Sequence, residues 1–381
     1  MSFIKLQGTT LFDGTRMLKD TVLIITPEGR VEAVVPRTEA GDDVKIVNGL
    51  LSPGFINCHC HLELSHMKGI IETHTGLLKF VNQVVSKRND NIADLPAAIE
   101  KAENEMLEQG IVAVGDICNT TDTLSLKAMG RLYYHNFVEV IGFEPAQAQE
   151  HFNRYKLVYD DYCRAVDPRQ VSLTPHAPYS VSTPLWQLLT AFPGNRLLSI
   201  HNQETPEENE WFLKGTGGFS ALYDRLQLQQ PPIPPEGKTS IQTYGAYLNN
   251  RQQALFIHNV FTSAEDIRYI KKRVPEAFWC LCPNANSYIS NRLPDIPMMM
   301  EQQVPLVLGT DSLASNYSLS IWDEIRCIQK QYPQLSLELL LTWATLNGAR
   351  ALQIADRYGS FEKGKSPGVL QIAEDQVCRL Y

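Results

Sequence analysis

The sequence has no long apolar run and no cysteine-dense segment. No apolar stretch reaches the roughly 20 residues that a membrane-spanning helix needs, and the first residues, MSFIKLQGTTLFDG, lack the apolar core of a signal peptide. Eight cysteines in 381 residues are too few for a disulfide scaffold. We therefore expect free thiols, a cytoplasmic location and no membrane partner.

Positive charge is also scarce. The chain has 34 Lys and Arg against 42 Asp and Glu, a formal net charge of -8, with no long run of one sign. An acidic chain without a basic patch argues against nucleic acid or an anionic membrane as the main partner. The expected partner, a small-molecule substrate, follows from the motifs described below. The composition leaves a homodimer open.

What the sequence does contain is an alternation of strands and helices. Eight β-rich segments lie at residues 50–61, 111–117, 133–143, 171–176, 197–201, 254–258, 278–283 and 304–311. Helical patterns between them include residues 95–109, 147–164, 183–190, 263–273 and 320–332. This order predicts an α/β fold, a (β/α)8 TIM barrel over residues 52–355.

Short β segments flank the predicted barrel on both sides. Residues 1–51 contain several strand patterns that end at Gly, Pro or Asp, and residues 356–381 look similar. We expect these two parts to form one small β-sandwich domain. Within the barrel, residues 215–240 are rich in Gly and Pro and break the rhythm. A long structureless insert is usually functional, so we expect it in the wall over the active site; a passive surface loop is the alternative.

The stretch NCHCHLELSH, residues 57–66, concentrates residues that bind metals. His59 and His61 are two positions apart, so on a strand both imidazoles point to the same side. Cys58 and Cys60 then point to the opposite side, towards the helix layer, where they pack. The two histidines are therefore the candidate ligands of this stretch.

Further metal-type side chains end other predicted strands. His201 ends the fifth, His258 the next one along the chain and Asp311 the last, and Glu204 follows His201 by three residues. The carboxyl ends of barrel strands meet on one face, where barrel enzymes place their active sites. We therefore expect these side chains to gather at a single site.

Three histidine nitrogens and one carboxylate suit one divalent metal, Zn²⁺ first and Fe²⁺ as the alternative. A metal-bound water can reach a pKa of about 7, which gives a hydroxide that attacks an sp² carbon. Glu204 is then placed to carry the proton of this water to a ring nitrogen or leaving group. His258 is expected to hydrogen-bond the water and stabilise the intermediate.

Several motifs together resemble the amidohydrolase superfamily, in its deaminase and chlorohydrolase branch. They are LLSPGFINCHCH, TPHAPYSVS, SIHNQET, CPNANSYIS, LGTDSLASNYSLSIWDEIR, TLNGARAL and YGSFEKGKSPGVLQI, in the family's order. Binuclear members carry a bridging carboxylated lysine on the fourth strand, but VSLTPH contains none. The resemblance therefore implies a mononuclear metal-dependent hydrolase. It implies the ligands His59, His61, His201 and Asp311, the catalytic residues Glu204, His258 and Asp311, and a substrate contact at His176.

The segments HLELSHMKG and LLKFVNQVVSKR resemble the aminodeoxyfutalosine deaminases of menaquinone synthesis, which act on an adenine nucleoside. Glu63 lies two residues past His61, on the same side if the strand continues, and is a predicted substrate contact; a rim carboxylate is the alternative. Ser312 and Asn316 are expected to orient Asp311 or line the pocket.

The substrate stays open at this stage. Adenosine-type relatives carry a ribose-binding Glu in the helix after the first strand, where LLKFVNQVV has no acid. Asn82, Gln83 or Glu63 would have to replace it. Alternatives are a deaminase of guanine, cytosine or a triazine, a chlorohydrolase or amide hydrolase on the same site, and a binding protein without catalysis.

Overall fold

Two four-stranded parallel sheets form the centre of the computed structural model, which describes residues 3–90 and 92–381. One sheet has the order β11-β10-β9-β8 and the other β12-β13-β14-β15. The strands are β8 Phe55–Cys60, β9 Ile111–Cys118, β10 Tyr133–Val140, β11 Val171–Pro175, β12 Leu197–Asn202, β13 Gln253–His258, β14 Ala277–Leu281 and β15 Leu306–Leu308. All eight predicted strands are thus confirmed, and so is the α/β class.

The edges of the two sheets approach each other at their carboxyl ends. Cys60 forms a parallel bridge with Asp311, and the backbone N–H of His201 donates to the carbonyl of His176 at 3.0 Å. Residues that end β8, β12 and β15 therefore meet at one place.

The five predicted helices are present, with ends shifted by one or two residues: α2 Leu95–Glu108, α4 Ala148–Ala165, α5 Thr183–Ala191, α9 Ala264–Lys271 and α12 Ile321–Gln331. Side-chain caps explain where α9 and α12 begin. Ser263 and Asp266 form a reciprocal capping box before α9, and the Ser320 side chain accepts from the N–H of Asp323.

The remaining helices are shorter or lie in connections. They are η1 Arg37–Glu39, η2 Leu62–Met67, α1 Leu77–Lys87, η3 Ile92–Asp94, α3 Leu124–Ala128, η4 Pro145–Gln147, η5 Pro168–Gln170, α6 Pro206–Lys214, α7 Gly218–Arg225, α8 Ser240–Tyr244, α10 Pro283–Ser290, α11 Ile296–Glu301, α13 Leu337–Thr342, η6 Trp343–Asn347 and α14 Gly348–Ala351. No helix in the described ranges combines the length and the apolar character needed to cross a membrane.

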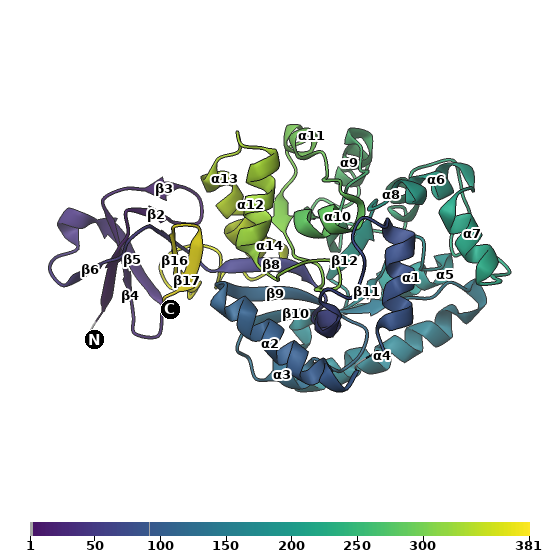
Figure 1. The fold of residues 1–381 in the computed structure, drawn as a ribbon, viewed down its shortest axis with the longest axis horizontal. Coiled ribbons are helices and arrows are strands. Elements are labelled where there is room, and N and C mark those ends of the chain that lie inside the picture. The colour runs from purple at the N-terminus through teal and green to yellow at the C-terminus, as the bar shows by residue number, and fades with distance from the viewer. Residues whose placement is uncertain (1–2, 91) are drawn as a thin grey trace.

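The two ends of the chain build a separate β region, at the left of Figure 1. One sheet has the order β5-β4-β1-β6, with β5 Val31–Pro36, β4 Thr21–Ile25, β1 Ile4–Gln7 and β6 Val44–Ile46. The other has the order β17-β16-β7-β2-β3, with β17 Gln376–Arg379, β16 Leu370–Ala373, β7 Leu50–Ser52, β2 Thr10–Phe12 and β3 Met17–Leu18. Because β7 pairs with β16, strands from the two ends of the chain lie in one sheet.

The prediction that residues 215–240 lack structure is wrong for their first half. This segment contains α7, whose Phe219 and Tyr223 are buried. Phe219 stacks on Tyr179 with ring centroids 4.4 Å apart, and the Tyr223 hydroxyl donates to the Tyr179 carbonyl at 2.8 Å. Tyr179 itself lines the cavity described below. The segment therefore supports the wall of the cavity from behind; none of its described residues lines it. Because Gly and Pro residues surround it, this short amphipathic helix was not predicted from the sequence.

Candidate active site

An open cavity lies at the carboxyl ends of the parallel strands. Most of the polar side chains predicted for the site line it: His61, His176, His201, Glu204, His258, Asp311 and Ser312. His59 lies beneath them and is fully buried. The structure thus brings together residues that are more than 250 positions apart in the chain.

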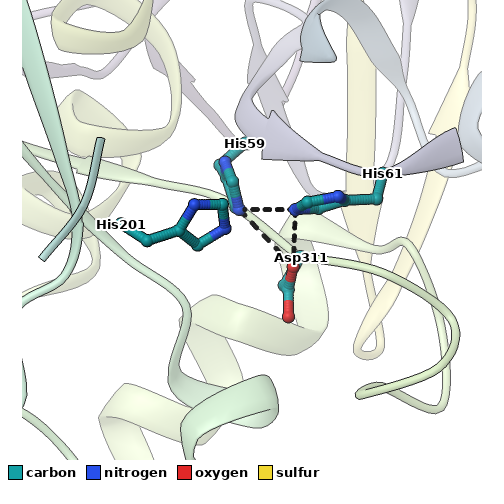
Figure 2. A group of neighbouring side chains, drawn as sticks. All are labelled: His59, His61, His201 and Asp311. Carbon is teal, nitrogen blue, oxygen red and sulfur yellow. Dashed lines mark hydrogen bonds and ion pairs between the residues drawn. The ribbon is translucent and has the colours of Figure 1, made fainter. Parts of the chain in front are cut away.

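Four of these side chains point toward one another (Figure 2). Nε2 of His59 and Nε2 of His61 are 3.2 Å apart, and they lie 3.4 and 3.3 Å from Oδ1 of Asp311. His201 completes a group whose ligand atoms all lie within 4.8 Å of one another. Buried ring nitrogens and a carboxylate aimed at one point fit a divalent cation, and the donor set matches the one that transition metals prefer.

The backbone around these residues is tightly fixed. The N–H of Asp311 donates to the carbonyl of His59 at 3.0 Å, and a Cβ at Gly309 would come within 2.8 Å of His59 Cβ. Only glycine therefore allows this close approach. Asp311 has φ of 57°, in the left-handed region that Asp tolerates better than most residues. This conformation turns the carboxylate out of the strand and toward the histidines.

Neighbouring polar groups orient the candidate ligands. Nδ1 of His201 lies 3.0 Å from the carbonyl of His176 and 3.4 Å from Oε1 of Glu139, so an Nδ1–H directed there leaves Nε2 for a metal. Glu139 in turn accepts from Nδ2 of Asn119 at 3.1 Å. The Ser315 hydroxyl donates to Oδ2 of Asp311.

No motif in the sequence predicts that Glu139, Asn119 and Ser315 support the candidate ligands. The one available signal was Glu139, a lone carboxylate within the apolar strand segment FVEV. Glu139 and His176 also form a second group with His201 that could hold a metal. Nδ1 of His201 already faces the carbonyl of His176, so His201 has one ring nitrogen left to bind a metal. We assign that nitrogen to the group of His59, His61 and Asp311.

Glu204 and His258 face each other in the cavity, with Oε2 and Nε2 3.7 Å apart. Burial, followed by the charges of Asp311 and Glu208, raises the pKa of Glu204 well above its usual range. His258 has φ of 72°, and its Nδ1 lies 3.0 Å from Nδ2 of Asn286. The pair thus offers a carboxyl that holds a proton readily beside an oriented imidazole, which suits general acid–base chemistry.

The three predicted substrate contacts differ in their positions. His176 and Ser312 line the cavity, so their contact with substrate stays a prediction. Glu63 does not line it: β8 ends at Cys60 and η2 begins at Leu62, so the strand does not continue. The carboxylate of Glu63 is buried and accepts from the backbone N–H groups of Asn119 and Thr120 at 3.0 and 3.2 Å. It therefore fixes the loop after β9 and is not the rim carboxylate that was the alternative.

Asn316 lies behind the ligand residue Asp311. Its Nδ2 donates to the carbonyl of Thr310 and to Oε1 of Glu324, each at 2.8 Å. It thus anchors the turn that carries Asp311. The cysteines of the first motif are buried, as expected, and all eight cysteines are free.

Comparisons with known proteins agree with this geometry. Adenosine deaminase of Helicobacter pylori is 28% identical over 326 residues, which cover 84% of this chain and 77% of that protein. Aminodeoxyfutalosine deaminase of Nitratiruptor sp. is 27% identical over 75% of this chain and 69% of the relative.

Solved structures of two deaminases are similar to this chain. The crystal structure of Helicobacter pylori aminofutalosine deaminase in complex with methylthio-coformycin superimposes with a TM-score of 0.84 and 25% identity, over 97% of this chain and 93% of that one. Guanine deaminase from C. acetobutylicum, with a TM-score of 0.73 over 98% of this chain and 91% of that one, is only 16% identical and shares the fold. Residues 50–369 match the Amidohydrolase family. The chain therefore belongs to the amidohydrolase family and is an enzyme that hydrolyses carbon–nitrogen bonds.

Proposed function

We propose that this protein is a metal-dependent deaminase of an adenine-type nucleoside, with aminodeoxyfutalosine of menaquinone synthesis as its substrate. The observation that carries the reaction type is the Glu204–His258 pair beside four converging candidate ligands in one cavity. The substrate class rests on the relatives, which are named adenosine deaminase and aminodeoxyfutalosine deaminase. Methylthio-coformycin bound to the Helicobacter pylori enzyme supports it as well.

In this proposal one divalent ion, zinc with iron as the alternative, is held by His59, His61, His201 and Asp311. Such an ion supplies an acidified water at neutral pH. The absence of lysine from β11 favours one ion over two. Ser315, through its bond to Asp311, keeps the carboxylate turned toward His59 and His61, where it would bind such an ion.

The residues of the chain then move the protons. Glu204 takes a proton from the attacking water and donates it to the ring nitrogen next to the amino-bearing carbon. His258 hydrogen-bonds the oxygen of the water and stabilises the intermediate, and His176 and Ser312 contact the substrate. The hydroxyl now on the carbon gives up its proton, which Glu204 passes to the exocyclic amine. The carbon–nitrogen bond then breaks, ammonia leaves and a carbonyl remains on the ring. An aliphatic amide lacks the ring nitrogen that Glu204 protonates and should react poorly.

Three structural details belong to the same proposal. The two parallel sheets close into a (β/α)8 barrel over residues 52–355, which the Cys60–Asp311 bridge supports. Residues 1–51 and 356–381 form the small β-sandwich domain. The enzyme works in the reducing cytoplasm, an environment that suits its eight free cysteines.

Ammonia release tests the function. Aminodeoxyfutalosine, adenosine, guanine and cytosine should be assayed for ammonia release beside a chlorinated triazine assayed for chloride release, and aminodeoxyfutalosine should have the highest kcat/KM. Turnover of only guanine, cytosine or the triazine would overturn the adenine assignment. His176→Ala should raise KM and lower kcat/KM for the nucleoside while the metal content stays unchanged.

Glu204→Gln tests the proton transfer. It should lower kcat by at least about 10²-fold and leave the metal bound. Glu210→Gln, on α6 and outside the cavity, is the matched control and should retain full activity. Near-normal kcat in Glu204→Gln would exclude its role in proton transfer, and loss of the metal would make Glu204 a ligand.

A further inference from the structure

The chain leaves β12 between His201 and Glu204, and the turn there decides where Glu204 points. Side chains alternate along a strand, so residues three positions apart would point to opposite sides of the sheet if the strand continued. His201 and Glu204 nevertheless line the same cavity. Gln203 lies between them and has φ of 45°, in the left-handed region that costs energy in residues other than glycine. This turn therefore directs Glu204 into the cavity, and other groups must hold it.

The carboxylate of Glu208, in α6, holds the backbone of this turn. Its Oε1 accepts from the backbone N–H of Gln203 at 3.0 Å and from the hydroxyl of Ser240 in α8. Gln203 and Glu208 are both completely buried. A buried N–H without a partner costs free energy, so the loss of this oxygen would penalise the turn in its present conformation.

Other groups hold the rest of Gln203. Its Nε2 donates to Oδ2 of Asp266 at 3.1 Å and to Oδ1 of Asn209 at 3.2 Å. Its carbonyl accepts from the N–H of Phe261 at 2.8 Å. In the described part of the chain, Glu208 is the only partner of its backbone N–H. The side chain and the carbonyl are therefore fixed independently of Glu208, and the N–H is not.

Glu208 is outside the cavity and does not line it. All the hydrogen bonds that its side chain makes to described residues go through Oε1, and Oε2 has no hydrogen-bond partner among them. A glutamine at this position would keep an oxygen of the same reach and would lose the charge. An aspartate would keep the charge and would withdraw the oxygen from the turn by one methylene. The site thus allows reach and charge to be changed separately.

We propose that Glu208 is the positioning residue of Glu204. Its Oε1 holds the N–H of Gln203, and this bond keeps the turn left-handed. The turn in turn directs the carboxyl of Glu204 toward His258, whose Nε2 lies 3.7 Å from Oε2 of Glu204. The inference rests on the proposed deamination and names the group that aligns its acid–base residue.

Two variants of Glu208 test the proposal, with the adenine nucleoside that has the highest kcat/KM in the assay above as substrate. Glu208→Asp should lower kcat roughly 10- to 100-fold, the factor that one charge-assisted hydrogen bond supports. Glu208→Gln should keep kcat within about fivefold. KM and metal content should stay unchanged in both, because neither change reaches the cavity lining or the candidate ligands. Glu210→Asp, in the same helix and outside the cavity, is the matched control and should retain full activity.

A double variant shows whether Glu208 acts through Glu204. Glu204→Gln/Glu208→Asp should have the kcat of Glu204→Gln alone, within about twofold, because no proton-transferring carboxyl is left to align. A general loosening of the fold would instead lower kcat by the same factor with or without Glu204. Circular dichroism verifies that each variant is folded.

The outcomes separate the positioning role from the proposed function. A large loss of kcat in folded Glu208→Gln would show that the charge matters and not the reach of the oxygen, and would overturn the proposal even if Glu208→Asp did not fold. Full activity in Glu208→Asp would overturn it too, and so would an equal loss from Glu208→Asp in the Glu204→Gln background. Ammonia release from no adenine nucleoside by the wild-type protein would overturn the proposed function, and the positioning role with it.

Discussion

Lys127→Met should destabilise the protein strongly, although Lys127 lies outside the cavity. Its ammonium group lies 2.5 Å from Oδ2 of Asp116, and both side chains are completely buried. Burial by itself would lower the pKa of Lys127, but the charge of Asp116 outweighs it and holds that pKa well above its usual range. Methionine keeps much of the volume and removes the charge, which leaves Asp116 as an unpaired buried carboxylate.

Breaking one side of a buried ion pair costs about 3–5 kcal/mol. Asp116→Asn should cost a similar amount, because it leaves the ammonium group of Lys127 without its carboxylate. The double variant Lys127→Met/Asp116→Asn contains no buried charge, and the Asn oxygen can still accept from the N–H of Leu62, which now donates to Oδ1 of Asp116 at 2.8 Å. Its loss should be below the sum of the single losses, by about 1–3 kcal/mol.

Urea unfolding of the metal-free protein, followed by tryptophan fluorescence and circular dichroism, measures these free energies. The metal must be absent from every sample, because a bound ion adds to the apparent stability. A loss below about 1 kcal/mol in Lys127→Met, or single losses that simply add, would refute the reasoning.

Three further predictions follow. Elemental analysis of the active enzyme should give about one transition-metal ion per chain, and two would contradict the mononuclear proposal. Asn259→Ala should lower kcat more than it raises KM, because Asn259 fixes the backbone next to His258 through bonds to the carbonyls of Phe256 and Cys280 at 2.7 and 3.1 Å; equal changes would point to a binding defect. Burial raises the pKa of Glu208 from 4.5 to about 7, so its contribution to stability is complete below about pH 4.5 and is lost as the pH rises through about 7. Glu208→Gln should remove about 3 kcal/mol of this decline in urea titrations between pH 4.5 and 8, and an unchanged decline would assign it to other groups.

The sequence was sufficient to predict where the strands lie and which side chains gather at their ends. His59 and His61 carry a local signal, because alternation along a strand places both imidazoles on one side. His201 and Asp311 could be added because parallel strands bring their carboxyl ends together. These inferences need only the order of the elements and not their exact register.

The supports of the site could not be predicted in the same way. Glu139 reaches His201 only because β10 and β11 pair in one particular register, and Asn119 reaches Glu139 only because of how the chain leaves β9. Glu63 shows the opposite error. Its predicted direction assumed two more residues of strand, and the turn into η2 places its carboxylate against the backbone of the loop after β9 instead.

The conformations at the strand ends are the part of the site that is furthest from sequence patterns. Asp311, His258 and Asn259 have φ of 57°, 72° and 62°, values that cost energy in residues other than glycine. A strand conformation at these positions would continue the alternation of the sheet, whereas the left-handed turn directs the Asp311 and His258 side chains into the cavity. The cost is offset by long-range bonds, such as the one from Nδ2 of Asn202 to Oδ1 of Asn259 at 3.0 Å, which joins the ends of β12 and β13. This bond can form only once both strands are in place, so the geometry of the site depends on the complete fold. The local conformational propensity of His258 therefore does not predict it.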